Sequence, residues 1–231
     1  MRHKLAVCIM LLTLGLALGL TPAAASAASG AVGVSLLGGY AWSTSSDAME
    51  GRDGYSGPYS SSFDDTWTGG AEATYRLPMG LSFGLGVQYL KLTADAARRG
   101  RSETDYANVQ LAPLYAVARY TYPVNSGITG HVEGGLGYAF ASAGKESGLD
   151  SMQAGLGENV DIDADNTFCG FVGAGADWFF TPQWSLGLGL RYWWLEPDYE
   201  IKAGNYGTID KGTFQADNLQ ALVSVTFWFG N

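Results

Sequence analysis

The stretch that decides the fold lies near the end of the chain and reads Leu219-Gln220-Ala221-Leu222-Val223-Ser224-Val225-Thr226-Phe227-Trp228-Phe229. Successive side chains of a strand point to opposite sides, so alternate residues share a face. One face carries the apolar row Leu219, Ala221, Val223, Val225, Phe227 and Phe229, and the other carries Gln220, Ser224 and Thr226. The alternation recurs along the chain, with small or polar residues opposite each apolar row. This pattern is typical of a membrane barrel with lipid outside and a polar interior.

A period of two predicts eight strands, at residues 31–42, 67–77, 80–92, 109–122, 128–142, 167–180, 184–195 and 218–229. Each is long enough to cross a bilayer, for which about 9–11 tilted residues suffice. The connections alternate between short segments at 77–79, 123–127 and 181–183 and long segments at 43–66, 93–108, 143–166 and 196–217. We therefore predict an all-β, eight-stranded, antiparallel up-and-down transmembrane β-barrel with short periplasmic turns and long extracellular loops.

The first residues have the pattern of a secretory signal peptide. Arg2, His3 and Lys4 precede the apolar residues 5–20, and the small-residue run 21–28 offers Ala-x-Ala cleavage sites. A membrane anchor is the alternative, but the apolar run is short and has no basic flank after it. We predict a cleaved signal peptide at 1–27 and a barrel domain at 28–231, located in the outer membrane of a Gram-negative bacterium.

The composition excludes several other classes of protein. The net charge is −9, and cleavage would make it more negative by removing Arg2 and Lys4, so a nucleic-acid partner is not expected. The mature chain would keep one cysteine, Cys169, and could form no internal disulfide. The 33 glycines and the charged fraction of only 15% are unusual for a soluble domain. A barrel with an apolar outer wall accounts for both values.

Aromatic residues gather at the ends of the predicted strands, as interfacial girdles do. The outer girdle would contain Trp42, Trp67, Tyr89 and Trp194, and the inner girdle Tyr75, Tyr122, Trp178, Phe180, Trp184 and Phe229. A soluble barrel that binds an apolar ligand is the competing interpretation. It would place the large apolar residues inside, whereas the inward face here consists of Gly, Ser, Thr and charged residues.

Two segments carry a resemblance to a known family: GHVEGGLGY at 130–138 and GAGADWFFTPQWSLGLGLRY at 173–192. They resemble the small outer-membrane barrel family that includes the OmpA transmembrane domain and OmpX. The resemblance implies the barrel fold and, as partners, outer-membrane lipid and the barrel-assembly machinery. The chain departs from the family by ending on Gly230-Asn231 instead of an aromatic residue. It also has no peptidoglycan-binding domain like that of full-length OmpA, so no tether to the cell wall is implied.

Seven charged or titratable residues fall on inward positions: Glu72, Arg76, Arg119, His131, Glu133, Asp177 and Arg191. Three carboxylates and three guanidiniums nearly balance, and buried charges need partners. The interior of an eight-stranded barrel is just wide enough for its own side chains. We therefore predict an interior charge network that plugs the lumen, mostly in the periplasmic half. The alternative is a gate whose ion pairs rearrange to admit small ions.

Catalytic and metal-binding residues are hard to find. Outer-membrane enzymes that act on lipid A need a histidine with a serine and a carboxylate near the outer rim. The mature chain has only His131, which we expect near a periplasmic turn, pointing inward and paired with Glu133. Residues 161–166 resemble the start of a calcium loop, but Val172 replaces the glutamate required at its twelfth position. We predict no catalytic site, metal or cofactor, and expect Cys169 to be an inward-facing packed residue.

The extracellular loops are the expected place for function. Three are acidic, and the second carries Arg98, Arg99 and Arg101. These arginines could contact lipopolysaccharide phosphates, or they could offset the acidic loops beside them. The main hypothesis is a non-enzymatic structural or surface-interaction barrel that binds an extracellular ligand or host surface through its loops. The alternative is a narrow porin-like channel, and a lipid A-modifying enzyme is a distant third.

Overall fold

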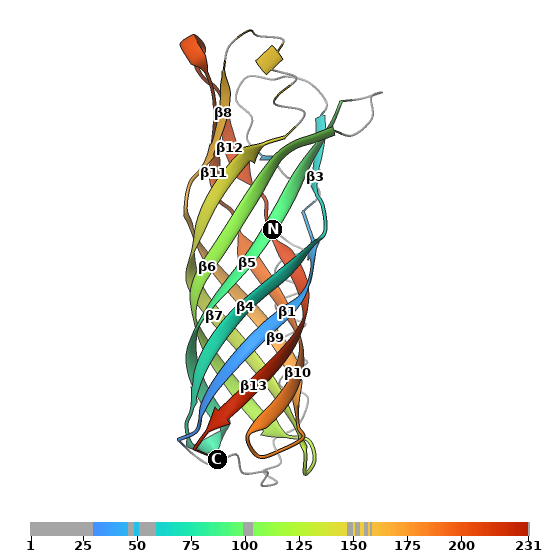
Figure 1. Ribbon diagram of the computed structural model, residues 1–231, viewed down its shortest axis with the longest axis vertical. Helices are drawn as coiled ribbons and strands as arrows, with labels where there is room; N and C mark the ends of the chain where they lie inside the picture. Colours follow the sequence, from blue (N-terminus) through green and yellow to red (C-terminus); the bar gives the residue numbers. More distant parts are fainter. Residues whose placement is uncertain are drawn as a thin grey trace.

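The computed structural model describes residues 30–45, 49–50, 59–98, 104–146, 150, 153–154, 157 and 159–230, and it shows a tall closed barrel (Figure 1). The predicted signal peptide lies outside the described residues. Within them, no helix is long and apolar enough to cross a membrane.

Eight long strands form the barrel wall: β1 (Val32–Ser43), β4 (Thr66–Arg76), β5 (Leu81–Arg98), β6 (Thr104–Pro123), β7 (Ile128–Lys145), β9 (Thr167–Phe179), β10 (Trp184–Leu195) and β13 (Asn218–Phe229). Each pairs antiparallel with the long strands before and after it in the chain, and β13 closes the cylinder against β1. Val32 lies opposite Phe229 and Ser43 opposite Asn218 in that closing pair. The predicted fold class is confirmed.

The short turns lie where the alternating pattern predicts them. Residues 77–80 join β4 to β5, and Met79 there adopts a left-handed φ of 70°. Residues 124–127 join β6 to β7, where the Asn125 side chain accepts hydrogen bonds from the amides of Gly127 and Ile128. Residues 180–183 join β9 to β10. These tight connections hold neighbouring strands in register at the periplasmic end.

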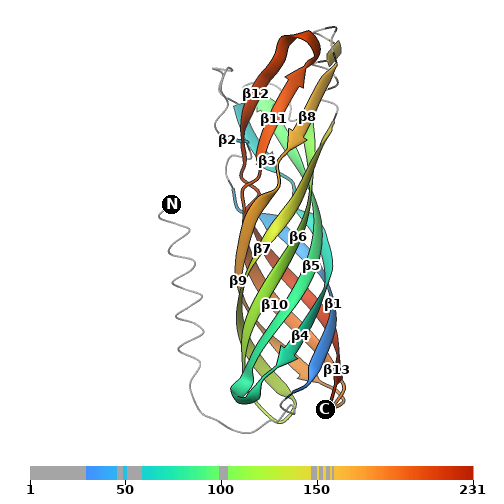
Figure 2. The ribbon, with the colours of Figure 1, turned by 90° about the vertical axis from the view of Figure 1, so that its left-hand side faces the viewer.

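The other end of the barrel is taller than predicted. β5 continues to Arg98 and β6 begins at Thr104, so most of the expected loop 93–108 is strand. The remaining expected loops contribute β2 (Met49–Glu50), β3 (Tyr59–Phe63), β8 (Val160–Ala164), β11 (Asp198–Ala203) and β12 (Gly207–Phe214). β3 pairs with the upper part of β5, and the other four form a sheet in the order β2-β12-β11-β8. Figure 2 shows β8, β11 and β12 rising beyond the long strands. We call the four-stranded sheet of β2, β12, β11 and β8 the extracellular extension.

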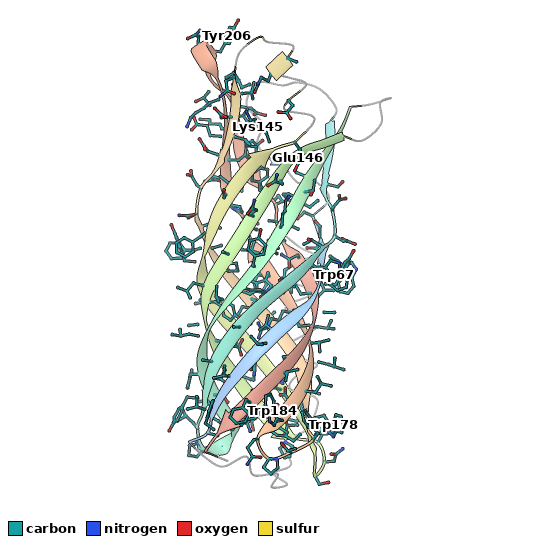
Figure 3. The ribbon with its side chains drawn as sticks, in the orientation of Figure 1. Trp67, Lys145, Glu146, Trp178, Trp184 and Tyr206 are labelled. Carbon is teal, nitrogen blue, oxygen red and sulfur yellow. The ribbon has the colours of Figure 1, made fainter. Side chains whose placement is uncertain are left out.

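The outward face of the wall is apolar between two levels of aromatic residues. Leu36, Leu85 and Leu136 expose 71%, 65% and 78% of their surface. Figure 3 places Trp178 and Trp184 at the end with the short turns and Trp67 farther up the wall. Other predicted girdle residues are also exposed: Trp42, Tyr75, Tyr89, Phe180 and Phe229. An exposed apolar band between aromatic girdles is the surface of a membrane barrel.

The inward face changes character along the barrel axis. The periplasmic half carries polar and charged side chains, whereas the outer half and the extension share an apolar core. That core includes Leu90, Leu92, Val109, Leu111, Phe171, Trp193, Leu195, Ile162, Tyr199, Ile201 and Phe214. The expectation of a polar inward face is therefore wrong for the outer half. The reason is that the strands continue past the outer girdle, where water replaces lipid outside and apolar side chains turn inward.

Glycines opposite large residues let the narrow lumen close-pack. Gly86 lies opposite Tyr115 on the neighbouring strand, and a Cβ on Gly86 would overlap the Tyr115 ring. Gly175 lies opposite His131, where a Cβ would approach the imidazole to 2.7 Å. Each large side chain thus takes the space that a small neighbour leaves. This pairing explains much of the high glycine content.

Candidate functional site

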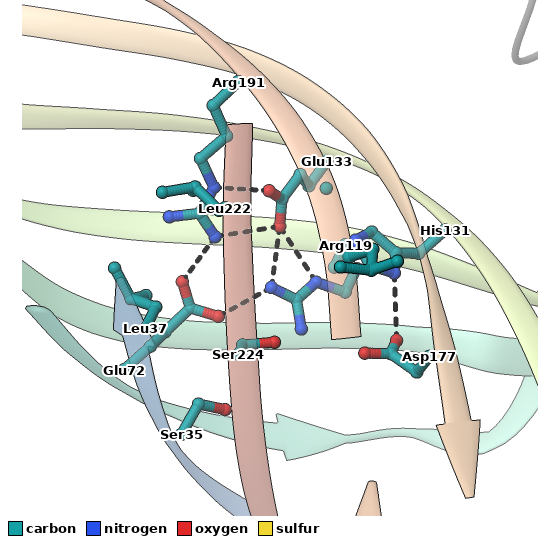
Figure 4. Close-up of a pocket in the computed structure, with 12 residues that line it drawn as sticks. Ser35, Leu37, Glu72, Arg119, His131, Glu133, Asp177, Arg191, Leu222 and Ser224 are labelled. Carbon is teal, nitrogen blue, oxygen red and sulfur yellow. Dashed lines mark hydrogen bonds and ion pairs between the residues drawn. The ribbon is translucent and has the colours of Figure 1, made fainter. Parts of the chain in front are cut away.

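Four of the seven predicted interior residues meet across the lumen. They are Glu72 on β4, Arg119 on β6, Glu133 on β7 and Arg191 on β10 (Figure 4). Arg119 Nη2 lies 2.8 Å from Glu72 and 2.7 Å from Glu133, while Arg191 lies 2.8 Å from Glu72 and 2.5 Å from Glu133. Each carboxylate thus contacts both guanidiniums in a closed ring, which we call the ion-pair ring. Because β1 and β13 separate β4 from β10, the Arg191–Glu72 contact spans the interior.

Aromatic residues cover the ring on its extracellular side. Tyr115 donates a hydrogen bond from its hydroxyl to Glu72 at 3.2 Å and accepts one from Arg191 at 3.1 Å. The Arg191 guanidinium also lies 4.7 Å from the centre of the Phe171 ring. Phe171 in turn packs on Trp193 at 4.6 Å between ring centres. The charges therefore border directly on the apolar core, which raises the cost of leaving any of them unpaired.

His131 has a different partner from the predicted one. The expected His131–Glu133 pair is wrong, because His131 Nδ1 lies 2.9 Å from Asp177 Oδ2 and Glu133 is taken up by the two arginines. The register explains the change. Glu133 lies opposite Gly173, which leaves room for the Arg191 side chain, whereas Thr129 lies opposite Asp177 one step below His131. His131 and Asp177 therefore meet diagonally across β7 and β9.

Arg76 is buried outside the ring, near the periplasmic end. Its guanidinium carbon lies 4.1 Å from the Trp228 ring centre and 5.8 Å from that of Phe179. Trp228 is inward-facing and donates a hydrogen bond to Ser185 at 3.0 Å. Only the polar residues Gln220, Ser224 and Thr226 are expected on this face of β13, but Leu222 and Trp228 share it. Leu222 lies two residues before Ser224, and Trp228 lies two residues after Thr226. The same alternation therefore places both of these large side chains on the inward face.

A small cavity lies beside the ring. Its volume is about 30 Å³, and its lining includes Ser35, Ser224 and Asp177 together with the ring residues. A space of this size admits very few water molecules. Above it, Gln88 on β5 donates a hydrogen bond to Gln220 on β13 at 2.6 Å, which links two strands that are not neighbours. Alternation within single strands does not predict this second polar contact across the lumen.

The junction with the extension is held by a buried carboxylate that the sequence did not reveal. Asp217 is 1% exposed and accepts hydrogen bonds from the Leu195 amide at 3.0 Å and from the Tyr192 hydroxyl at 3.3 Å. Thr44 donates a further hydrogen bond to the Asp217 carbonyl at 3.1 Å. These contacts join the upper ends of β1, β10 and β13 directly below the extension. Cys169 is buried in the adjacent core, as predicted.

The outward face of the extension carries paired charges. Lys202 lies 2.9 Å from Glu200 and 3.4 Å from Asp163, and these two carboxylates raise the pKa of Lys202. The Thr208 hydroxyl donates a hydrogen bond to Glu200, and this bond together with Lys202 lowers the pKa of Glu200. Asp161 lies 3.5 Å from Lys145. Most of the calcium-like run at 161–166 lies in strand β8. No cluster of three metal-ligating side chains occurs among the described residues. Arg98 ends β5, but its side chain and the whole of Arg99 and Arg101 lie outside the described residues.

The fold, the lipid-facing belt and the charged interior together define a small outer-membrane β-barrel protein. The chain belongs to the outer membrane protein beta-barrel domain family, whose model matches residues 11–227. A search of curated proteins finds no match.

Solved structures of outer-membrane barrels are similar to this one. The outer membrane protein OprG from Pseudomonas aeruginosa matches with a TM-score of 0.66 and 14% identity, covering 88% of this chain and 98% of that one. The outer membrane protein AlkL matches with a TM-score of 0.56 and 14% identity, and the match covers 91% of this chain and 96% of AlkL. Outer membrane protein W of E. coli matches with a TM-score of 0.50 and 17% identity, and the match covers 88% of this chain and 100% of that protein. The family and the fold indicate the Gram-negative outer membrane.

Proposed function

We propose that this protein is a non-enzymatic outer-membrane barrel with a closed lumen, which presents its extracellular extension to a ligand or to another surface. The observation that supports closure is the ion-pair ring, in which Glu72, Arg119, Glu133 and Arg191 join four strands across the interior. Breaking a buried pair leaves an uncompensated charge and costs several kcal/mol. The ring therefore resists the rearrangement that conduction would need.

The apolar core adds a second barrier. An ion that passed the ring would have to displace fully buried side chains such as Leu90, Leu111 and Trp193. These apolar side chains are buried, and they offer an ion nothing to replace its hydration shell. Two unlike barriers in series support a closed barrel over the alternative of a narrow channel.

The extension supports a surface role. Its inward face packs on the core through Tyr199, Ile201 and Phe214, so the sheet is attached firmly to the barrel. The β11–β12 hairpin carries Tyr206 at its tip, 67% exposed and at the top of the molecule (Figure 3). An exposed aromatic residue on a supported hairpin is suited to contact with a partner, because little conformational freedom is lost on binding.

Planar-bilayer recording of the purified protein tests closure. We expect no large, stable conductance from the wild type. Arg191→Ala should produce openings if the ring is the main barrier, and Lys202→Ala, which changes a charge outside the lumen, serves as the control. Large, steady conductance from the wild-type protein would reject the closed barrel and favour the narrow channel.

The absence of enzymatic activity is part of the proposal. His131 is 6% exposed, lies inside the lumen and pairs with Asp177, so its imidazole is held away from the lipid-facing wall. A general base must reach the group that it activates. Turnover of lipid A by the purified protein, through acyl transfer or deacylation, would contradict this part of the proposal.

We propose lipopolysaccharide and the barrel-assembly machinery as the remaining partners, with secretion directed by the signal peptide at 1–27. The triple substitution Arg98/Arg99/Arg101→Ser should reduce lipopolysaccharide retained during purification, because guanidinium groups bind phosphate in a bidentate geometry. The single substitution Lys145→Ser controls for the general loss of positive charge. Equal retention by all three proteins would assign the arginines to balancing the acidic loops instead.

A further inference from the structure

The lipid-facing wall of the barrel has a hollow toward its periplasmic end. Its volume is about 540 Å³, and its lining comes mainly from β7, β9, β10 and β13. Ala174 and Ala176 on β9 and Ala221 on β13 supply small outward side chains to it. Their register neighbours on β10 are Leu188 and Leu190, which are 61% and 48% exposed. We call this feature the wall hollow.

The sequence creates the wall hollow by placing small residues on both faces of the wall. Gly175 and Gly189 lie opposite each other between the outward alanines and leucines, and neither has a side chain. On the inner side, His131 takes the space beside Gly175, where a Cβ would approach the imidazole to 2.7 Å. On the outer side, the alanine methyl groups are too short to fill the space. A group that fills the wall hollow must therefore come from outside the barrel.

The wall hollow lies in the hydrocarbon region, next to the inner girdle. Ala176 is two residues from Trp178 and Leu188 is four residues from Trp184, and Figure 3 places both tryptophans at the end with the short turns. Tyr122 lines the hollow at the same end. The hydrocarbon around a membrane barrel contains no water, so the group that enters must be apolar. A hollow left unfilled there would deprive its lining of van der Waals contacts on one side.

We infer that the wall hollow is a binding site for an acyl chain of a phospholipid from the periplasmic leaflet. The hollow is continuous with the lipid-facing belt, so a chain reaches it without any rearrangement of the barrel. A chain that enters the membrane from the periplasmic side passes the inner girdle first and then reaches Ala176 and Ala174. Trp178 and Tyr122 stand at the height of its ester groups, where amphipathic aromatic side chains contact both the polar groups and the chain. A seated chain gains contacts on several sides, whereas lipid on the convex wall is contacted on one side only.

Other occupants fit the wall hollow less well. A twofold symmetric pair of barrels brings the same patch of each molecule together, so two hollows would face each other and leave space between them. A flexible acyl chain bends to follow Leu188 and Leu190 and has no such restriction. Lipopolysaccharide enters the membrane from the extracellular side, beyond the level of Trp67, and the hollow lies toward the opposite end (Figure 3).

Filling the hollow with larger side chains tests the inference. The double substitution Ala174→Leu/Ala176→Leu should displace the acyl chain, because both positions lie within the hollow. Ala73→Leu is the matched control, since Ala73 is an exposed alanine on β4, between Val34 and Leu85, and does not line the hollow. Native mass spectrometry of the purified proteins, after incubation with phosphatidylethanolamine, measures the phospholipid that stays bound. We expect bound phospholipid on the wild type and on Ala73→Leu, and its loss from the double variant.

A second readout uses the wild-type protein alone, in nanodiscs of phosphatidylethanolamine and phosphatidylglycerol. With isotope-labelled alanine methyl groups, NMR cross-relaxation from the acyl methylene protons reports how long a chain stays beside each alanine. We expect stronger cross-relaxation at Ala174 and Ala176 than at Ala73. This comparison does not depend on the folding of any variant.

Three results would overturn the inference. Equal cross-relaxation at the three alanines, or no phospholipid retained by the wild type, would show that the hollow meets only fluid lipid. Retention of lipopolysaccharide in preference to phospholipid, when both are supplied, would assign the hollow to the outer leaflet. Cross-linked dimers of the wild type that the double variant no longer forms would assign it to a second copy of the barrel.

Discussion

At the scale of single residues, the ion-pair ring is stabilised by geometry more than by the attraction of any one pair. Two guanidiniums and two carboxylates alternate, so each charge has opposite charges on both sides. A buried charge is tolerated only when pairing and hydrogen bonds replace its hydration. Removing one member therefore affects the two charges that it touches.

Glu133→Gln should accordingly lower the free energy of unfolding by about 3–5 kcal/mol, because Arg119 and Arg191 would then share only Glu72. Urea titration in lipid vesicles, followed by tryptophan fluorescence, provides the measurement. Glu200→Gln, which changes an exposed glutamate of the extension, is the control and should have no measurable effect. Equal loss in both variants would contradict the structural role of the ring.

The substitution Gly86→Ala tests close packing in the lumen. The new Cβ would overlap the Tyr115 ring, which cannot swing away easily because Glu72 and Arg191 hold its hydroxyl. We expect a loss of about 1–3 kcal/mol from overpacking. Gly38→Ala is the matched control, since its Cβ would meet nothing nearer than the Thr68 carbonyl oxygen at 3.8 Å. Comparable stability of the two variants would show that the lumen has spare room.

Residue alternation in the sequence predicted which side chains face inward but not which of them meet. All seven predicted interior residues lie in the lumen, because a period of two assigns a face without any knowledge of the neighbouring strand. Partner choice depends on register across two strands. His131 is therefore paired with Asp177, although Glu133 is nearer in the chain.

At the scale of elements, the extension shows where local patterns were too short to interpret. Val160-Asp161-Ile162-Asp163 and Tyr199-Glu200-Ile201-Lys202 alternate as clearly as the barrel strands. Each run is a strand of only five or six residues, and the two runs pair with each other although they come from different expected loops. A single segment carries no information about such partners, so the sequence pattern predicts loops at both runs.

Ile201→Ala tests whether the extension is part of the folded core. Ile201 is 1% exposed and belongs to the core that the barrel and extension share. Its truncation should cost about 2–5 kcal/mol and make the hairpin cleavable by protease added to intact cells. Lys202→Ala, one residue away on the outward face, should leave protease resistance unchanged. Resistance in both variants would mean that the hairpin is held by other contacts.

At the scale of the whole molecule, the wall separates three environments along one axis. Lipid faces the apolar belt between the girdles, the charged half of the lumen lies toward the periplasm, and the apolar core begins above the ring. The sequence predicted the belt and the charged half because both follow from alternation within single strands. The sequence did not predict the apolar core in the outer half of the lumen. The position along a strand at which the outside changes from lipid to water cannot be read from the pattern of that strand alone.

Cys169 offers a test of closure in the intact barrel. It would be the only cysteine after signal-peptide removal, and it is buried in the shared core. A membrane-permeant maleimide should label it slowly in the folded protein and completely in denaturant, because the thiol must become accessible before it reacts. Mass spectrometry gives the labelled fraction. Rapid labelling of the folded wild type would show that the outer lumen opens.

The β11–β12 hairpin has a consequence for how such barrels change in length. Its strands pair antiparallel, with one register shift between Ile201 and Lys202, and β11 alternates buried Tyr199, Ile201 and Ala203 with charged residues on the outward face. Adding two residues to each strand would preserve both faces, whereas adding one would turn every side chain beyond it around. The reach of the protein above the membrane can therefore grow or shrink in two-residue steps, while the charged interior near the periplasm stays the same.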